Sequence, residues 1–259
     1  MTTGKRWLLL ALLAIAGLPG GPGWACTTFL LGHGGQRMMA ANLDWPAGDG
    51  MVVVNKRGLE KTAVTNPARP LKPAVWKSRY GSVTFNQYAI DWPWGGMNEA
   101  GLAGTALMTR WAAYPQPDHR PSVFMLQWLQ YQLDNFGSVQ DVLDHVSEIR
   151  IRPVSRGKGV HFFFCDRMGD AAVVEYIDAR SLIYRGDDLP VTAIANDPYA
   201  ASLVYLKKIK GFGGTFPISE GNLSKDRFVR AADGIATFAA ADAPVGADAA
   251  FGRLDRVAY

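Results

Sequence analysis

The stretch that decides the fold reads Ala25-Cys26-Thr27-Thr28-Phe29-Leu30-Leu31, near the start of a chain of 259 residues. Its β-branched and apolar residues predict a strand from Thr27 to Leu31. His33-Gly34-Gly35 follows as a turn, so we expect Met38 to Leu43 to be the second arm of a hairpin. A cysteine therefore stands directly before the first strand of a sheet.

The residues before this stretch have the composition of a secretory signal peptide. Lys5 and Arg6 form a short basic region, and an apolar run from Trp7 to Leu18 follows it. That run is shorter than the roughly 20 residues that a membrane-spanning helix needs. It ends in Gly23-Trp24-Ala25, with small residues at the two positions that a signal peptidase reads. This pattern predicts an exported protein, periplasmic or secreted, without stable membrane insertion.

Cleavage after Ala25 would divide the chain into a signal peptide, residues 1–25, and one mature domain, residues 26–259. The domain would keep 25 basic and 23 acidic residues, because the leader holds two positive charges and no acidic ones. This near balance, without a Lys/Arg cluster, argues against nucleic acid as a partner. No spacing of His, Cys, Asp or Glu indicates a metal site, and we expect no cofactor.

The order of the expected elements predicts the fold class. Strands and helices alternate in blocks: strands over 27–108, helices over 123–146, strands over 160–195 and helices over 199–240. Ser122 and Ser224 stand where helix N-caps are expected. Blocks of each type favour antiparallel sheets covered by helices. We therefore predict an α+β fold, a four-layer αββα sandwich of two antiparallel sheets flanked by helices.

An N-terminal cysteine would combine a nucleophile and a base in one residue. A thiol with a pKa of about 8.5 is only a few per cent thiolate at neutral pH. The α-amino group has a pKa of about 8, so after cleavage it can accept the proton of the Cys26 thiol. The four histidines are scattered and do not indicate a Cys-His pair: His33, His119, His145 and His161.

Two other roles for Cys26 stay open at this point. It could carry a lipid anchor, although Gly23 stands where a lipoprotein signal has an aliphatic residue, and no polar linker follows the cysteine. It could also form a disulfide with Cys165, the second of two cysteines. Because Cys165 closes an apolar strand, a packed free thiol is the simpler interpretation.

Four segments of the chain resemble the choloylglycine hydrolase and penicillin V acylase family, within the N-terminal-nucleophile hydrolases. They occur in the family's order: Cys26-Thr27-Thr28-Phe29 with Asn42-Leu43-Asp44-Trp45, Gly96-Met97-Asn98-Glu99-Ala100-Gly101-Leu102, Ala195-Asn196-Asp197-Pro198, and Asp226-Arg227-Phe228-Val229-Arg230. The resemblance implies an αββα fold. It also implies hydrolysis of a small-molecule N-acyl amide, a non-peptide linear amide, through a thioester.

The resemblance implies a role for each matching position: Cys26 as the nucleophile, Asp44 as the carboxylate that binds its α-amine, Asn196 and Asn98 as donors to the oxyanion, and Arg227 as the cation near the thiolate. Other interpretations stay open for these residues. The asparagines and Asp44 also suit ordinary turns. Arg230, on the same expected helix, is an equal candidate for the cation.

The chain departs from the family pattern in two ways. Ala41 stands where many relatives have an arginine, and Arg37 lies about 13 Å further along the expected strand. Relatives also continue for several strands beyond Tyr259, so a C-terminally truncated sheet with an exposed edge is expected. Three alternatives therefore remain: an acyltransferase of the same fold, a catalytically silent relative, and an anchored or disulfide-bonded binding protein. Assembly into a homo-oligomer also stays open.

Overall fold

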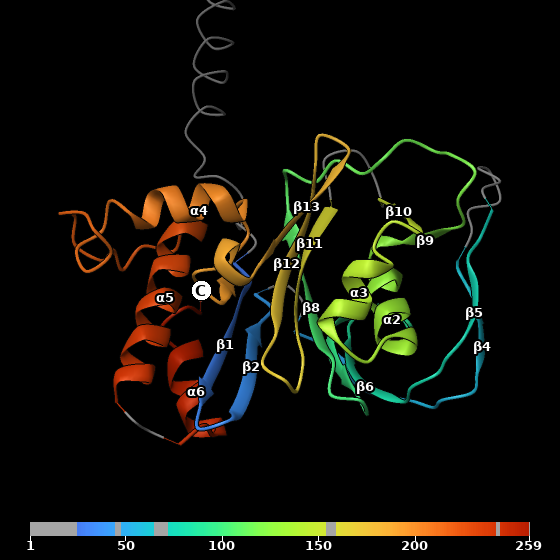
Figure 1. The fold of residues 1–259 in the computed structure, drawn as a ribbon, viewed down its shortest axis with the longest axis horizontal. Coiled ribbons are helices and arrows are strands. Elements are labelled where there is room, and N and C mark those ends of the chain that lie inside the picture. The colour runs from blue at the N-terminus through green and yellow to red at the C-terminus, as the bar shows by residue number, and fades with distance from the viewer. Residues whose placement is uncertain (1–24, 45–47, 65–71, 154–158, 242–243, 259) are drawn as a thin grey trace, which may run out of the picture.

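A computed structural model describes residues 25–44, 48–64, 72–153, 159–241 and 244–258. The predicted signal peptide, up to Trp24, lies outside the described residues. The described part forms four layers (Figure 1): two helices, a large sheet, a small sheet and three more helices. The predicted αββα sandwich is confirmed.

The larger sheet is antiparallel and has the strand order β13-β12-β11-β8-β7-β6-β3. Its strands in chain order are β3 (Met51–Asn55), β6 (Ser82–Asn86), β7 (Pro93–Asn98), β8 (Ala103–Thr109), β11 (Gly159–Cys165), β12 (Ala171–Ile177) and β13 (Arg180–Arg185). The smaller sheet, with the order β14-β1-β2, consists of β1 (Thr27–His33), β2 (Gln36–Asn42) and β14 (Ala193–Ile194).

Helices cover the outer face of each sheet. On the larger sheet lie α2 (Met125–Asn135) and α3 (Val139–Asp144), and on the smaller one α4 (Tyr199–Leu206), α5 (Ser224–Ala240) and α6 (Ala247–Leu254). Two short pairs complete the described fold: β4 (Glu60–Thr62) with β5 (Val75–Lys77), and β9 (Ser122–Phe124) with β10 (Arg150–Arg152). None of the described helices is long and apolar enough to cross a membrane.

The predicted hairpin is present, and glycine chemistry explains its turn. Residue His33 pairs with Gln36, which leaves Gly34 and Gly35 as a two-residue loop. Both have positive φ, 55° and 84°, the conformation that a tight hairpin turn requires and that glycine adopts without steric cost. The turn fixes the register of β1 on β2, so Thr27 lies opposite Asn42.

The core consists of two apolar clusters, one on each face of the larger sheet. The first packs α2 against the sheet, with Trp128 fully buried beside Phe162 at a ring distance of 4.5 Å. Trp128 is therefore part of the core. The second cluster fills the space between the two sheets and under α5, and it contains Cys26 and Cys165. Both cysteines are free thiols, so the structure contains no disulfide between them.

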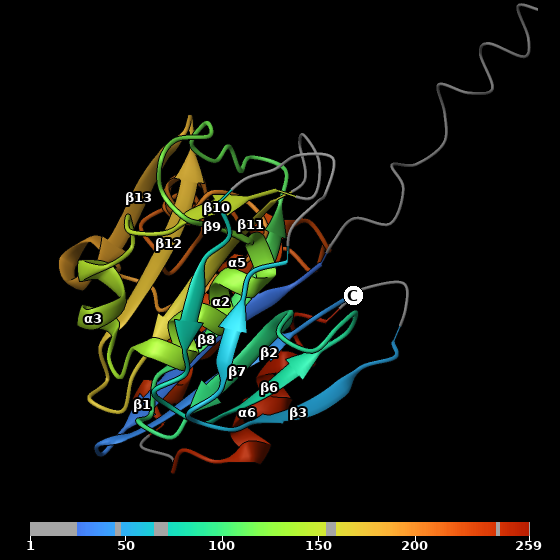
Figure 2. The same cartoon turned by 90° about the vertical axis from the view of Figure 1, so that its right-hand side faces the viewer.

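Part of the inner face of the larger sheet is exposed. Figure 2 shows the β3 edge of this sheet with β6 and β7 beside it. Paired residues of these strands share one face and expose large apolar side chains: Val52, Val54, Val83, Phe85 and Met97. Met97 pairs with Ala103, which is buried between the sheets. Within the described residues, the smaller sheet does not extend over this region.

Both predicted serine caps are corrected by the structure. Ser122 lies in β9 and its hydroxyl donates to the Lys72 carbonyl at 3.2 Å, while α2 begins after Phe124 without a side-chain cap. Ser224 is the first residue of α5, and its hydroxyl oxygen accepts a hydrogen bond from the Asp197 backbone at 2.7 Å. Each serine therefore connects segments that are distant in sequence.

Candidate active site

Cys26 lies directly before β1 and is 1% exposed, between the two sheets. The register of β1 on β2 brings Asn42 beside it, because the Thr27 backbone N–H donates to Asn42 Oδ1 at 2.6 Å. Asn42 Nδ2 in turn donates to Asp44 Oδ2 at 2.9 Å. The hairpin therefore places the predicted carboxylate, Asp44, beside the predicted nucleophile.

Asn42 is a site residue to which the sequence motif alone assigned no role. Its side chain connects the first residue of β1 to the Asp44 carboxylate and also donates to the Val257 carbonyl at 3.3 Å. Only the cross-strand register gives it this position. An asparagine two residues before the aspartate would have been the sequence signal.

Asn196 follows β14, which pairs with β1 and so brings the asparagine to the start of that strand. Its Nδ2 donates to the Met108 carbonyl at 2.8 Å, and its Oδ1 accepts from Arg227 Nη2 at 2.7 Å. These two contacts fix which way the amide faces. The Asn196 side chain also hydrogen-bonds the Cys26 thiol, so the predicted oxyanion donor contacts the predicted nucleophile.

Arg227, from α5, is fully buried against the nucleophile's segment. Its Nη1 donates to the carbonyls of Ala25 and Cys26 and to Thr27 Oγ1, each at 2.6 Å. Arg230 instead donates to backbone carbonyls away from Cys26, those of Ser219, Gly221 and Arg256. The structure therefore distinguishes the two arginines, and Arg227 is the cation of the site.

The surroundings of Cys26 act on its thiol in opposite directions. Burial raises the pKa of the Cys26 thiol, while a hydrogen bond from the Asp44 backbone and the positive charge of Arg227 oppose that rise. Burial lowers the pKa of Arg227 to about 10, against the charges of Cys26 and Asp44. A buried thiol with a raised pKa needs a nearby base before it can attack a carbonyl.

The structure corrects the predicted role of Asn98. Its Nδ2 donates to the carbonyls of Leu133 and Phe136 at 2.8 and 2.7 Å. Its Oδ1 accepts from the backbones of Ala100 and Leu102 at 3.1 and 3.0 Å. Because both amide hydrogens already bond carbonyls at the end of α2, neither remains for an oxyanion. Asn98 is a structural residue that joins β7 to the C-terminus of α2.

Arg37 does not replace the arginine that Ala41 lacks. Ala41 pairs with Thr28 near the site, whereas Arg37 pairs with Gly32 at the opposite end of the hairpin. The Arg37 side chain lies over Gly32 and Gly169. Of the arginines considered from the sequence, Arg227 is therefore the one that lies beside Cys26.

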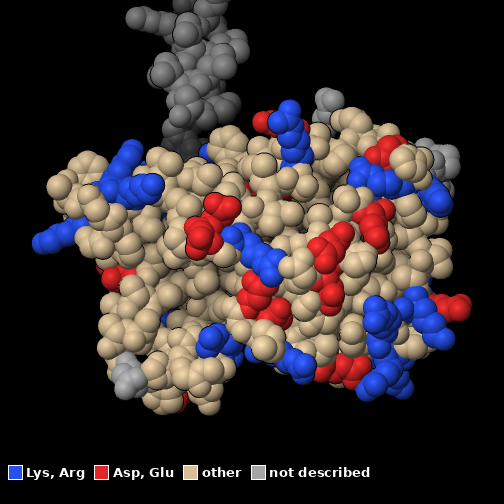
Figure 3. Space-filling model, viewed as in Figure 1, with Lys and Arg blue, Asp and Glu red and all other residues tan. Residues whose placement is uncertain are grey.

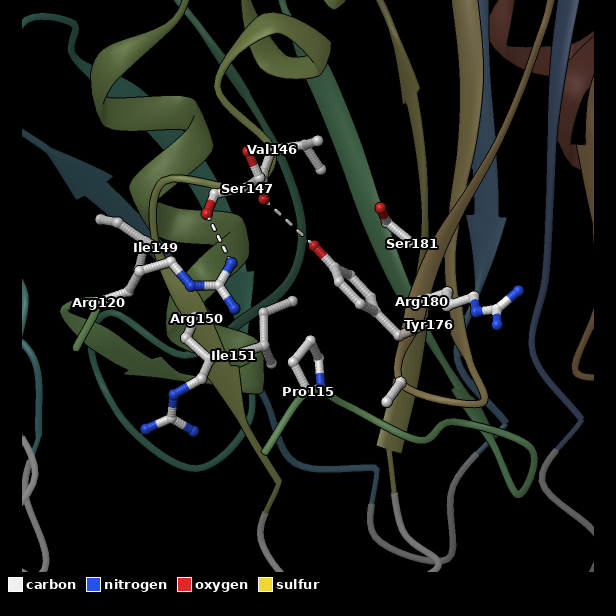
Figure 4. A pocket seen from close by; sticks show the side chains of 11 residues that line it. Pro115, Arg120, Val146, Ser147, Ile149, Arg150, Ile151, Tyr176, Arg180 and Ser181 are labelled. Atoms are coloured by element: carbon white, nitrogen blue, oxygen red, sulfur yellow. Dashed lines mark hydrogen bonds between the residues drawn. The ribbon is translucent and has the colours of Figure 1, made fainter. Parts of the chain in front are cut away.

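A separate hollow of about 370 Å³ lies beside β10 and the end of β12 (Figure 4). Its lining includes Arg120, Arg150 and Tyr176, and Tyr176 donates to the Val146 carbonyl at 3.4 Å. None of its eleven lining residues is Cys, His, Asp or Glu. It therefore lacks a strong nucleophile or a general base, and we place the candidate chemistry at Cys26.

Charged side chains of both signs lie on the face of the molecule that Figure 3 shows. On the face shown in Figure 3, acidic and basic residues are interspersed and form no field of one sign. Among the described residues, no group of three or more His, Cys, Asp or Glu side chains could hold a metal ion.

The fold and the residues around Cys26 place the chain among the linear amide C–N hydrolases. Within that class it belongs to the choloylglycine hydrolase family, whose model matches residues 26–217. The match begins at Cys26 and includes Asp44, Asn98 and Asn196.

Known proteins agree with this placement. A penicillin V acylase of Pectobacterium atrosepticum is 30% identical over 173 residues, which cover 60% of this chain and 45% of that protein. The chain thus spans about half the length of this curated relative. A solved penicillin V acylase from Agrobacterium tumefaciens is 31% identical, with a TM-score of 0.72, over 90% of this chain and 72% of that one.

A more distant structure shares the fold. A mutant of the conjugated bile acid hydrolase from Clostridium perfringens is 17% identical, with a TM-score of 0.74, over 90% of this chain and 78% of that one. At this identity the likeness concerns the architecture alone.

Proposed function

We propose that this protein is an exported cysteine amidase whose nucleophile, Cys26, becomes the N-terminal residue of the mature chain. Three observations support the proposal. The leader has the pattern of a signal peptide that ends at Ala25. The family match begins at Cys26. The contacts of Asn196 and Arg227 with Cys26 carry most weight, because they surround one thiol with a hydrogen-bond donor and a cation.

Release of residue 25 would give the site its base. In the uncleaved chain the nitrogen of Cys26 is an amide and cannot accept a proton, and the Ala25 carbonyl accepts a hydrogen bond from Arg227. Cleavage would replace that amide by a primary amine on the same residue as the thiol. The positive charge of Arg227 favours the neutral form of such an amine, which is the form that accepts a proton.

The proposed reaction proceeds in two halves. The Cys26 thiol gives its proton to the α-amine, and the sulfur attacks the substrate carbonyl carbon. Asn196 Nδ2 donates to the oxyanion that forms. The C–N bond then breaks, the α-amine returns the proton to the leaving amine, and an acyl thioester remains on Cys26. Water attacks that thioester, which releases a carboxylic acid and restores the thiol.

The substrate class follows from the relatives as a proposal. Two penicillin V acylases, at 30% and 31% identity, are among the similar proteins. We therefore propose an apolar, linear or aromatic N-acyl amide as the substrate, and penicillin V as the first probe. A conjugated bile acid is the second probe, because a bile acid hydrolase shares the fold.

The test uses purified mature protein with each probe. Product analysis should show equal amounts of acid and amine, and quenched reactions should show an acyl group on Cys26 that the Cys26→Ala variant lacks. An added amine acceptor separates the rival acyltransferase, which would form a new amide instead of the acid. Absence of both the products and the adduct with every N-acyl probe would reject the amidase and favour a silent relative.

A further inference from the structure

Glu175 and His161 form a buried pair that the proposed reaction does not use. Glu175 lies on β12 and His161 on β11, and each is 1% exposed. His161 Nδ1 lies 2.8 Å from Glu175 Oε1. Glu175 Oε1 also accepts a backbone N–H, so we assign the ring nitrogen as the donor in this contact.

The same carboxylate oxygen holds the start of α4. Glu175 Oε1 accepts a hydrogen bond from the Tyr199 backbone N–H at 3.0 Å. Tyr199 is the first residue of α4, and the N-cap, Pro198, supplies no side-chain bond. Glu175 therefore caps this helix from a different strand. Its contact lies three residues after Asn196.

Strand β11, which carries His161, pairs with β8, and β8 accepts a hydrogen bond from Asn196. Val160 and His161 pair with Met108 and Leu107 of β8. The Met108 carbonyl accepts from Asn196 Nδ2 at 2.8 Å. The segment from Asn196 to Tyr199 is thus held at one end by β8 and at the other by Glu175.

Stability alone explains this pair poorly. Among the described residues, neither Glu175 Oε2 nor His161 Nε2 has a hydrogen-bond partner. Burying two ionisable groups costs folding free energy, and a buried polar atom without a hydrogen bond adds to that cost. A role in holding the Tyr199 backbone in place accounts for the two hydrogen bonds of Glu175.

We propose that Glu175, held in place by His161, is a positioning residue that fixes the Asn196 segment so that Asn196 Nδ2 meets the oxyanion. This inference rests on the proposed function, because it assigns Glu175 an effect on the same reaction. The hydrogen bonds that Glu175 makes go to His161 and to the Tyr199 backbone, and not to Cys26 or Asn196. Its effect is transmitted through the Tyr199 backbone.

A double-mutant cycle tests the proposal. Glu175→Leu removes the acceptor and should lower kcat about tenfold or more with KM changed less than about twofold. Glu175→Gln keeps an amide oxygen that can accept the Tyr199 N–H, so it should stay within about threefold of the wild-type kcat. In the Asn196→Ala background, Glu175→Leu should cost less than about twofold, because the residue it acts through is already gone.

Asp166→Leu is the matched control. Asp166 is also a buried carboxylate and accepts backbone hydrogen bonds from Val139, Met168 and Asp170, away from Asn196. This variant should lower stability and leave the kcat of the folded fraction unchanged. If Glu175→Leu lowers kcat by the same factor with and without Asn196, or leaves it unchanged, the proposal is overturned.

Hydrogen exchange of residues 195–202, measured without substrate, separates this proposal from the proposed function. Exchange should become faster in Glu175→Leu and not in Asp166→Leu. If exchange responds in this way while wild-type protein hydrolyses no amide, the proposed function fails and the positioning contact stands. If exchange is unchanged in Glu175→Leu, the positioning role fails whatever the activity.

Discussion

Arg227 Nη2 donates to Asn196 Oδ1 at 2.7 Å, and so connects α5 to the segment that follows β14. The neighbouring Nη1 of the same guanidinium donates to the Cys26 carbonyl at 2.6 Å. One planar group therefore sets the distance between the proposed nucleophile and its oxyanion donor. A planar guanidinium can make both contacts at once, and a lysine ammonium cannot reproduce that geometry.

Arg227→Lys should lower kcat about 10- to 100-fold, because hydrogen bonds to a charged group are worth roughly 1.5–3 kcal/mol each. Steady-state kinetics with the best probe measure the change. Arg230→Lys is the control, since Arg230 bonds only backbone carbonyls away from Cys26 among the described residues. Equal losses of kcat in the two variants would contradict the distinction between these arginines.

Asn196→Ala should lower kcat by about 10² to 10³, the usual effect of losing one oxyanion donor. KM should change little, because the oxyanion exists only during the reaction. Single-turnover kinetics give the rate of acyl-enzyme formation directly. An unchanged acylation rate would mean that a different group donates to the oxyanion.

Asn98→Ala should act on stability instead of catalysis. The substitution breaks four hydrogen bonds to the backbone, so we expect a loss of about 3 kcal/mol in the free energy of unfolding. Urea denaturation measures that loss, and kcat is compared below the unfolding transition. A kcat reduced as strongly as in Asn196→Ala would restore Asn98 to the oxyanion hole.

Cys165 should make the fold sensitive to alkali. Burial, and then the nearby charge of Asp166, raise the pKa of the Cys165 thiol to about 12. At pH 10 an unfolded thiol ionises while this one stays neutral, so stability falls as pH rises from about 9 towards 12, by about 1.5 kcal/mol at pH 10. Unfolding free energies at pH 8 and 10 should differ less in Cys165→Ala. An equal difference would exclude this thiol as a cause.

Much of the fold could be predicted because its signals are local. The β-branched and apolar run after Cys26, the two glycines of the first hairpin and the helical period of α5 each specify an element within a few residues. The strands β4, β5, β7 and β10 were not predicted individually, and β9 lies where the first helix was expected to begin. The pairing of β9 with β10 depends on partners distant in sequence, such as Arg150 with Ser122.

Four motif residues of the site lie together as expected, but a motif match alone did not give the role of a residue whose contacts depend on its neighbours in space. Cys26, Asp44, Asn196 and Arg227 come together as expected. The structural role of Asn98 depends on α2, because carbonyls at the end of that helix accept the hydrogen bonds of the Asn98 amide. The contact of Asn42 with Thr27 follows from the register of the hairpin. The spacing of residues in the sequence does not give that register.

The most direct test of the account is mass spectrometry of the exported protein before and after reaction with an acylating substrate analogue. The account predicts a mature chain that begins at Cys26 with a free amine and gains one acyl group on that residue, with no adduct in Cys26→Ala and an unchanged adduct in Cys165→Ala. A chain that begins at another residue, a blocked amine on Cys26, or an adduct on Cys165 would contradict it.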